Sequence, residues 1–225
     1  MHRCLLLPGA VVATGAAAFF FLADAASEND GPTTIDPRIA HAVLQDRSST
    51  GTSIARLLTF VGSEGVLSIA TLLVVIWLLG RRRVSSAVAV GVAMAGSAAL
   101  TVGAKLWVGR LRPEAVLRLG PRDESYSFPS GHTLNSSVLL AMVAILIVPI
   151  VTRWSVRLAT WSVLTLLAVG IGLSRVYLGY HWFTDVAGSW VLATVWVTIV
   201  IGGLPLVTNV LQRSRFSRTD HQTFF

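Results

Sequence analysis

The segment that decides the fold is residues 84–106, VSSAVAVGVAMAGSAALTVGAKL, an apolar run with a lysine next to its end. A helix needs about 20 mostly apolar residues to cross the hydrocarbon core of a bilayer. We therefore predict that this run spans a membrane. Its many glycines and alanines suit close helix–helix packing in lipid. Lys105 then lies near one membrane surface, with Arg112 and Pro113 just beyond it.

The composition of the whole chain also indicates a membrane protein. Hydrophobic residues make up 53% of the chain and charged residues 13%, with a mean hydropathy of +0.69. A soluble domain carries about 25% charged residues. The net charge is +7, but no basic cluster accompanies a soluble nucleic-acid-binding pattern, so we expect no nucleic-acid partner. The single cysteine, Cys4, excludes an intrachain disulfide.

Six apolar segments predict an all-α fold, an integral membrane bundle of six transmembrane helices within one domain, residues 1–225. The second segment is interrupted near its start by Gly62, Ser63, Glu64 and Gly65, which allows its first part to lie at the membrane interface. The predicted spans are residues 5–23, 57–79, 84–106, 134–151, 156–173 and 186–206.

The two ends of the chain have their own predictions. Residues 1–25 contain Arg3, an apolar run and the small-residue sequence Ala23-Asp24-Ala25. A signal peptide has these features, but its apolar region is usually only ~7–15 residues long. We therefore favour a first transmembrane helix and keep the signal peptide as the alternative. Residues 212–225 are predicted to be a polar cytoplasmic tail.

Basic residues in short loops predict the orientation in the membrane, because such loops stay in the cytoplasm. Arg81, Arg82 and Arg83 lie between the second and third spans, so we assign that side to the cytoplasm. If six helices alternate in direction, three polar motifs meet at the opposite, outer face. These are Lys105–Arg112, Ser130–His132 and the segment from Arg175 to Asp185.

The third motif offers a nucleophile. His181 and Asp185 are four residues apart at the start of the last span, which places them on one face of a helix. A carboxylate bonded to one ring nitrogen fixes the tautomer and leaves the other nitrogen free to attack. This pattern predicts a histidine that forms a phosphohistidine intermediate. Taken alone, the pair also fits an interfacial cap of the helix.

The second motif, Pro129-Ser130-Gly131-His132, precedes the fourth span. Ser130 is a candidate N-cap, and Gly131 lets the backbone approach a ligand closely. The free N–H groups of a helix start bind phosphate oxygens. His132 is then placed to protonate a leaving oxygen.

Three cations complete the predicted site. Arg112 and Arg175 present planar forks that match phosphate oxygens, and Lys105 adds a compact charge. Catalysis of phosphoryl transfer consists mostly of positioning and charge stabilisation. Further basic residues in the loop after the third span are interpreted as surface or headgroup contacts without a catalytic role: Arg110, Arg118 and Arg122.

The joint spacing of these motifs resembles the three signatures of the type 2 phosphatidic acid phosphatase superfamily. The first is Lys105, six residues, then Arg112-Pro113, and the second is Pro129-Ser130-Gly131-His132. The third is Ser174-Arg175, five residues, His181, three residues, and Asp185. Every signature position is filled, in the expected order.

The resemblance implies a single membrane-embedded phosphatase domain with a metal-free, cofactor-free mechanism. His181 would be the nucleophile, Asp185 its activating partner, and His132 the proton donor to the leaving group. The phosphate would be held by the remaining signature residues, which are Lys105, Arg112, Ser130, Gly131 and Arg175.

We expect the substrate to be a membrane lipid phosphate. A polyprenyl pyrophosphate such as undecaprenyl pyrophosphate is favoured, followed by phosphatidylglycerol phosphate and phosphatidic acid. The enzyme would be a multi-pass protein of the plasma membrane with its site facing outward. A phosphotransferase using the same nucleophile stays open, as does a non-catalytic scaffold or transporter. A vanadium haloperoxidase shares the anion pocket, but those proteins are soluble. The sequence does not indicate the oligomeric state.

Overall fold

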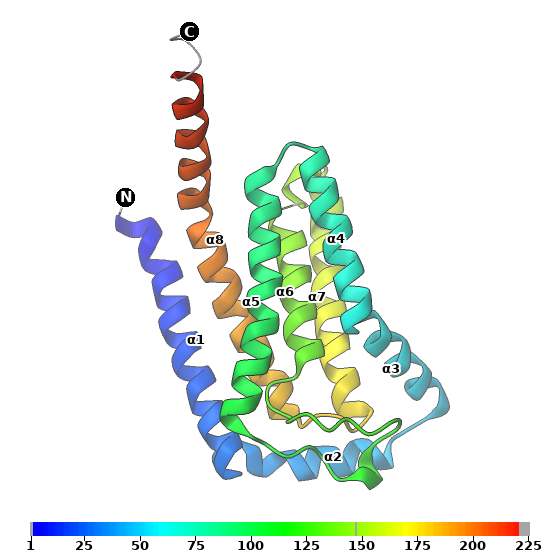
Figure 1. The fold of residues 1–225 in the computed structure, drawn as a ribbon. Helices are drawn as coiled ribbons and strands as arrows, with labels where there is room; N and C mark the ends of the chain where they lie inside the picture. Colours follow the sequence, from blue (N-terminus) through cyan, green and yellow to red (C-terminus); the bar gives the residue numbers. More distant parts are fainter. Residues whose placement is uncertain (1, 147, 221–225) are drawn as a thin grey trace.

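The computed structural model describes residues 2–146 and 148–220, and these residues form helices and loops without a β-strand (Figure 1). The all-α prediction is therefore confirmed. Three short 3₁₀ turns lie at Gly31–Ile35, Ala115–Leu117 and Val148–Ile150. The α-helices are α1 (His2–Glu28), α2 (Asp36–Gln45), α3 (Ser49–Val61), α4 (Glu64–Gly80), α5 (Val84–Val108), α6 (Gly131–Leu146), α7 (Trp154–Tyr177) and α8 (Phe183–Asp220).

Five helices of the described chain are long and apolar enough to cross a membrane, and a bent pair of helices brings the count to six when it is taken as one broken span. The pair is α3 and α4, which meet at an angle of 48° where Gly62 and Ser63 interrupt the helix. This agrees with the predicted irregular start of the second span. The five long spans are Leu7–Glu28, Val84–Val108, Gly131–Ile150, Trp154–Tyr177 and Phe183–Leu204.

Both ends of the described chain are helical. Helix α1 runs beside α8 (Figure 1), and its Phe19 ring lies 5.6 Å from the ring of Phe128 in the loop before α6. Retention of this helix stays a prediction. The predicted tail, residues 212–225, continues α8 as a helix up to Asp220, and residues 221–225 lie outside the described residues.

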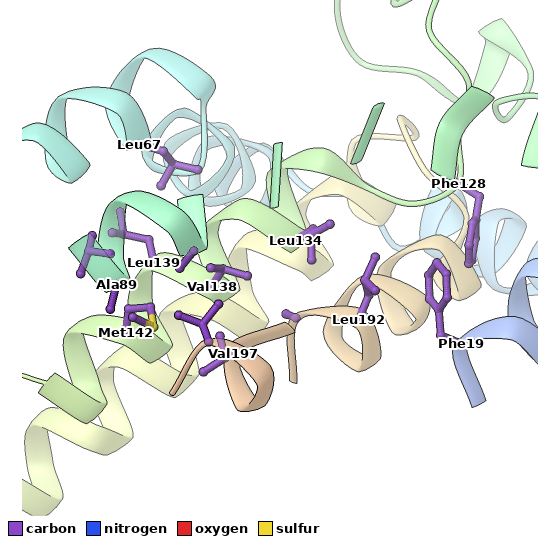
Figure 2. Close-up of a cluster of buried hydrophobic side chains, with 14 of the residues drawn as sticks. Phe19, Leu67, Ala89, Phe128, Leu134, Val138, Leu139, Met142, Leu192 and Val197 are labelled. Atoms are coloured by element: carbon purple, nitrogen blue, oxygen red, sulfur yellow. The ribbon is translucent and has the colours of Figure 1, made fainter. Parts of the chain in front are cut away.

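A core of apolar side chains joins α5, α6 and α8, with Phe19 of α1 at one end (Figure 2). Lipid tails are as apolar as these side chains, so such helices associate through close packing and not through escape from water. Small residues make that packing possible. A Cβ added at Gly172 of α7 would lie 2.7 Å from Trp190, 2.9 Å from Val186 and 3.1 Å from Thr133. The last turns of α7 are therefore held tightly against α6 and α8.

This packing brings the three motifs to one end of the bundle. In Figure 1, α5 and α7 end where α6 and α8 begin, and the start of α1 and the end of α8 lie away from this end. The loop between α5 and α6 covers this end, and α2 lies across it. The predicted convergence of Lys105–Arg112, Ser130–His132 and Arg175–Asp185 is thus present in the structure.

Candidate active site

The centre of the site is the pair His181 and Asp185. His181 lies in the short turn between α7 and α8, where its backbone N–H donates to the Arg175 carbonyl at 3.3 Å. Its ring Nδ1 is 3.3 Å from Asp185 Oδ2. The same carboxylate oxygen accepts the backbone N–H of Trp182 at 2.9 Å, so Asp185 also caps α8. An ionised Asp185 makes Nδ1 the protonated nitrogen and leaves the lone pair on Nε2.

The His181 ring is neutral in this environment. Burial lowers the pKa of His181 most strongly, and the positive charges of Arg112 and Arg175 lower it too. The hydrogen bond and charge of Asp185 oppose them, and together these causes bring the pKa to about 3. Only 3% of His181 is exposed. A neutral imidazole has the free electron pair that a nucleophile needs.

Arg112 faces the free nitrogen of that ring, with Nη1 3.2 Å from His181 Nε2. All five of its N–H bonds have partners. Nε donates to the Ser125 carbonyl at 2.7 Å, Nη1 also donates to the Tyr180 carbonyl at 2.7 Å, and Nη2 donates to Ser125 Oγ at 2.9 Å and Asp123 Oδ2 at 2.6 Å. A guanidinium has no further donors, so an incoming anion must displace one of these groups.

The loop residues Asp123 and Ser125 therefore take up hydrogen-bond donors of the cationic side chains at the site. Burial raises the pKa of Asp123, but the Arg112 charge and the bonds from Ser125 outweigh it and hold this pKa below its usual value. Lys105 Nζ donates to Ser125 Oγ at 3.1 Å and to the Tyr126 carbonyl. The same loop thus contacts both Lys105 and Arg112.

The second motif forms the start of α6 beside this centre. The buried Ser130 hydroxyl accepts from Thr133 Oγ1 at 2.9 Å and lies 3.5 Å from Thr133 N, as an N-cap does. The Ser130 backbone N–H donates to Ser189 Oγ at 2.9 Å, and that hydroxyl donates to the Asp185 carbonyl at 2.7 Å. The first N–H groups of a helix have no partner within the helix, which leaves those of Gly131 and His132 suited to an anion.

Two predicted residues lie near the centre without bonding to it. The His132 ring and the Arg175 guanidinium make no hydrogen bond with His181 or Asp185, all four of which lie in the described part of the chain. Arg175 is buried, donates to Thr59 Oγ1 at 2.6 Å, and lies 4.2 Å from the centre of the Tyr180 ring. Its guanidinium therefore contributes positive charge near the site, and Arg175 bonds to His181 only through its backbone carbonyl.

The interpretation of Arg110 as a surface contact is wrong. Arg110 is only 4% exposed, and its Nη1 lies 2.7 Å from Asp185 Oδ1. Its Nη2 lies 2.8 Å from Asp36 Oδ2 at the start of α2. The sequence did not indicate that Arg110 and Asp36 are buried. Loop arginines are usually solvated, and Asp36 lies in a segment without apolar periodicity. Arg122, in contrast, is exposed and pairs with Glu124 at 3.5 Å.

Three side chains contribute positive charge to the site, Lys105, Arg112 and Arg175. Within residues 2–146 and 148–220, no three His, Cys, Asp or Glu side chains are grouped as metal ligands. Lys105, Arg112 and Arg175 are instead grouped around a neutral histidine, an arrangement that suits an anionic group undergoing transfer.

Two curated proteins with similar sequences are named as a phosphatase and a diphosphatase. The chain is 33% identical to phosphatidylglycerophosphatase B of Bacillus subtilis over 101 residues, which cover 44% of this chain and 48% of that protein. It is 32% identical to an undecaprenyl-diphosphatase of Sulfolobus acidocaldarius over 82 residues, covering 36% and 35% of the two chains. These alignments span less than half the length of the curated relatives.

Solved structures share the fold over most of the chain. A transmembrane PAP2-type phosphatidylglycerolphosphate phosphatase of Bacillus subtilis superposes with a TM-score of 0.76 at 23% identity, covering 85% of this chain and 94% of that one. LpxE of Aquifex aeolicus superposes with a TM-score of 0.59 at 20% identity, covering 75% and 95%.

The family model of the PAP2 superfamily matches residues 86–206, more than half of the chain, and this segment contains all three motifs. The resemblance seen in the motifs is confirmed, and the protein belongs to the PAP2 superfamily.

Proposed function

We propose that this protein is an integral membrane phosphatase that cleaves lipid phosphates or diphosphates through a phosphohistidine on His181. One observation carries the proposal: a buried, neutral imidazole whose Nδ1 is bonded to Asp185 and whose Nε2 faces Arg112. The ring thus presents one defined nitrogen to the cations of the site, and attack requires that Arg112 Nη1 leave Nε2 and bond to a phosphoryl oxygen instead.

In the first step, the Nε2 lone pair of His181 attacks phosphorus and the bond to the lipid oxygen, or to the lipid monophosphate, breaks. The electron pair of that bond leaves with the departing oxygen, which takes a proton from His132 in its cationic imidazolium form and leaves that ring neutral. Asp185 stabilises the positive charge that builds on the imidazole, through its hydrogen bond to Nδ1. Arg112, Lys105 and the α6 N–H groups hold the phosphoryl oxygens.

In the second step, a water molecule attacks the phosphorus of the phosphohistidine. His132, which lost its proton in the first step, accepts one from this water. The P–N bond breaks, its electron pair returns to His181 Nε2, and inorganic phosphate leaves. The cycle needs only acid–base groups and fixed cations, so we propose that it runs without a metal ion.

The substrate is a lipid whose phosphate lies at the membrane surface. This is supported by the position of His181 and Asp185 where α7 ends and α8 begins, at the end of the bundle where α5 also ends and α6 begins (Figure 1). We favour a polyprenyl diphosphate, then phosphatidylglycerol phosphate, then phosphatidic acid. The names of the two curated relatives support the first two classes. The site is proposed to face outward from the plasma membrane, since Arg81–Arg83 lies at the opposite end.

The first test is phosphate release by detergent-purified protein in EDTA, from undecaprenyl pyrophosphate, phosphatidylglycerol phosphate and phosphatidic acid. The wild type should release phosphate from at least one of them. His181→Gln should lower kcat by at least about a thousandfold, because no other group supplies the attacking nitrogen. The matched control is His41→Gln, which changes an exposed histidine of α2 and should keep wild-type rates. Full activity of His181→Gln, or none without added metal, would contradict the mechanism.

A second test uses the loop whose residue Asp123 pairs with Arg112. Asp123→Asn should lower KM for the lipid phosphate by about two- to fivefold, because it removes a partly exposed carboxylate that competes for Arg112. The value of kcat should change little. Glu124→Gln is the control, since Glu124 is 80% exposed and pairs only with Arg122 among the described residues. An increase of KM in Asp123→Asn would show that this carboxylate orients Arg112 for binding and does not compete with the substrate.

A further inference from the structure

Arg110 connects two buried carboxylates that come from opposite ends of the sequence. Its Nη1 binds Asp185 Oδ1 at 2.7 Å, and its Nη2 binds Asp36 Oδ2 at 2.8 Å. The exposed fractions of the Asp36, Arg110 and Asp185 side chains are 1%, 3% and 0%. Buried charges are costly unless they are paired and hydrogen-bonded. Three buried charged side chains in contact therefore suggest a specific role.

Asp36 also holds the first turn of α8. Its Oδ1 accepts the backbone N–H of Thr184 at 3.0 Å, and its Oδ2 accepts the Thr184 hydroxyl. Arg110 Nη1 donates to the same hydroxyl at 2.8 Å. Helix α2 therefore caps α8 from outside, at the turn that carries Asp185.

The two oxygens of Asp185 have different partners. Oδ1 is bonded to Arg110, whereas Oδ2 accepts from His181 Nδ1, Trp182 N and Ser127 Oγ. Arg110 thus fixes the rotation of the carboxylate and keeps Oδ2 directed at the imidazole. A carboxylate held by a second group orients its histidine more firmly than one held by the histidine alone.

The charges also match the reaction. Before attack, Asp36, Arg110, Asp185 and a neutral His181 carry one net negative charge. When the P–N bond forms, the imidazole becomes positive and the four groups sum to zero. Without Asp36, the same step would leave one net positive charge in a buried cluster, which low-dielectric surroundings disfavour.

We propose that Asp36 and Arg110 are positioning residues for the nucleophile, through which helix α2 orients Asp185 and balances the charge that develops on His181. This inference rests on the proposed function, because it concerns the same histidine. It predicts that both residues act when a bond to Nε2 forms and contribute little to holding a phosphate in its ground state.

The test compares two probes, orthovanadate and inorganic phosphate, by calorimetric titration of the full-length, detergent-purified protein. Orthovanadate can add a nucleophile and imitates the five-coordinate state of phosphoryl transfer, and such analogues report transition-state contacts. Phosphate reports ground-state binding. In Asp36→Asn, the Kd of orthovanadate should rise by about tenfold or more, as when a group that orients a binding residue is removed. The Kd of phosphate should stay within about twofold, because its cations are untouched.

The variant is chosen to preserve the fold, since the Asn carbonyl can still accept the Thr184 N–H and cap α8. Arg110→Lys is the second variant; it keeps the charge but cannot bind two carboxylates with one planar fork, and it should show the same contrast. Asp46→Asn is the matched control, an exposed carboxylate at the end of α2, and it should change neither Kd.

An equal rise in the Kd of orthovanadate and of phosphate would overturn the inference, because a purely structural role affects both probes alike. An unchanged Kd for orthovanadate would overturn it as well. Lipid turnover by the wild type separates this from the proposed function. Absent turnover with the vanadate–phosphate contrast present would refute the lipid phosphatase and support the positioning role. Lipid turnover without the vanadate–phosphate contrast would support the lipid phosphatase and refute the positioning role.

Discussion

The structure depends on one constraint, a carboxylate buried in the first turn of a membrane helix. Asp185 is fully buried, and such a charge persists only when its oxygens are bonded. Its partners are His181 and the backbone N–H of Trp182 in the turn before α8, and Ser127 and Arg110 in the loop after α5. Satisfying this one carboxylate therefore brings the turn and the loop together, and the anion site forms around the result.

Lipid imposes the second constraint. The helices gain little from leaving lipid for protein, so their positions depend on shape, and Gly172 shows how closely α7 must approach α6 and α8. That approach places the end of α7 beside the starts of α6 and α8, and the polar groups of the site meet where the bundle ends. Helix α2 and the loop before α6 cover this end of the bundle (Figure 1), where His181 and Asp185 are buried. Burial favours the neutral imidazole and strengthens the ion pairs.

Much of this arrangement follows from sequence. Apolar runs of membrane length predicted the six spans, and helix alternation predicted that Lys105, Ser130 and His181 lie at one end. The sequence did not reveal Asp36, because it lies 149 residues from Asp185 in a segment without periodicity, and only the tertiary fold brings them near Arg110. Nor could the sequence show that Asp123 forms an ion pair with Arg112. The path of an irregular loop depends on its tertiary contacts, which the pattern of apolar and polar residues does not reveal.

The most direct test of the central claim is chemical identification of the intermediate. Full-length protein would be mixed with a lipid substrate carrying ³²P in its terminal phosphate, quenched within milliseconds in base, and digested for mass spectrometry. The account predicts an acid-labile, base-stable phosphate on His181, absent from His181→Gln. Phosphate on His132, or release of labelled phosphate in single turnover with no protein-bound label at any time, would contradict it.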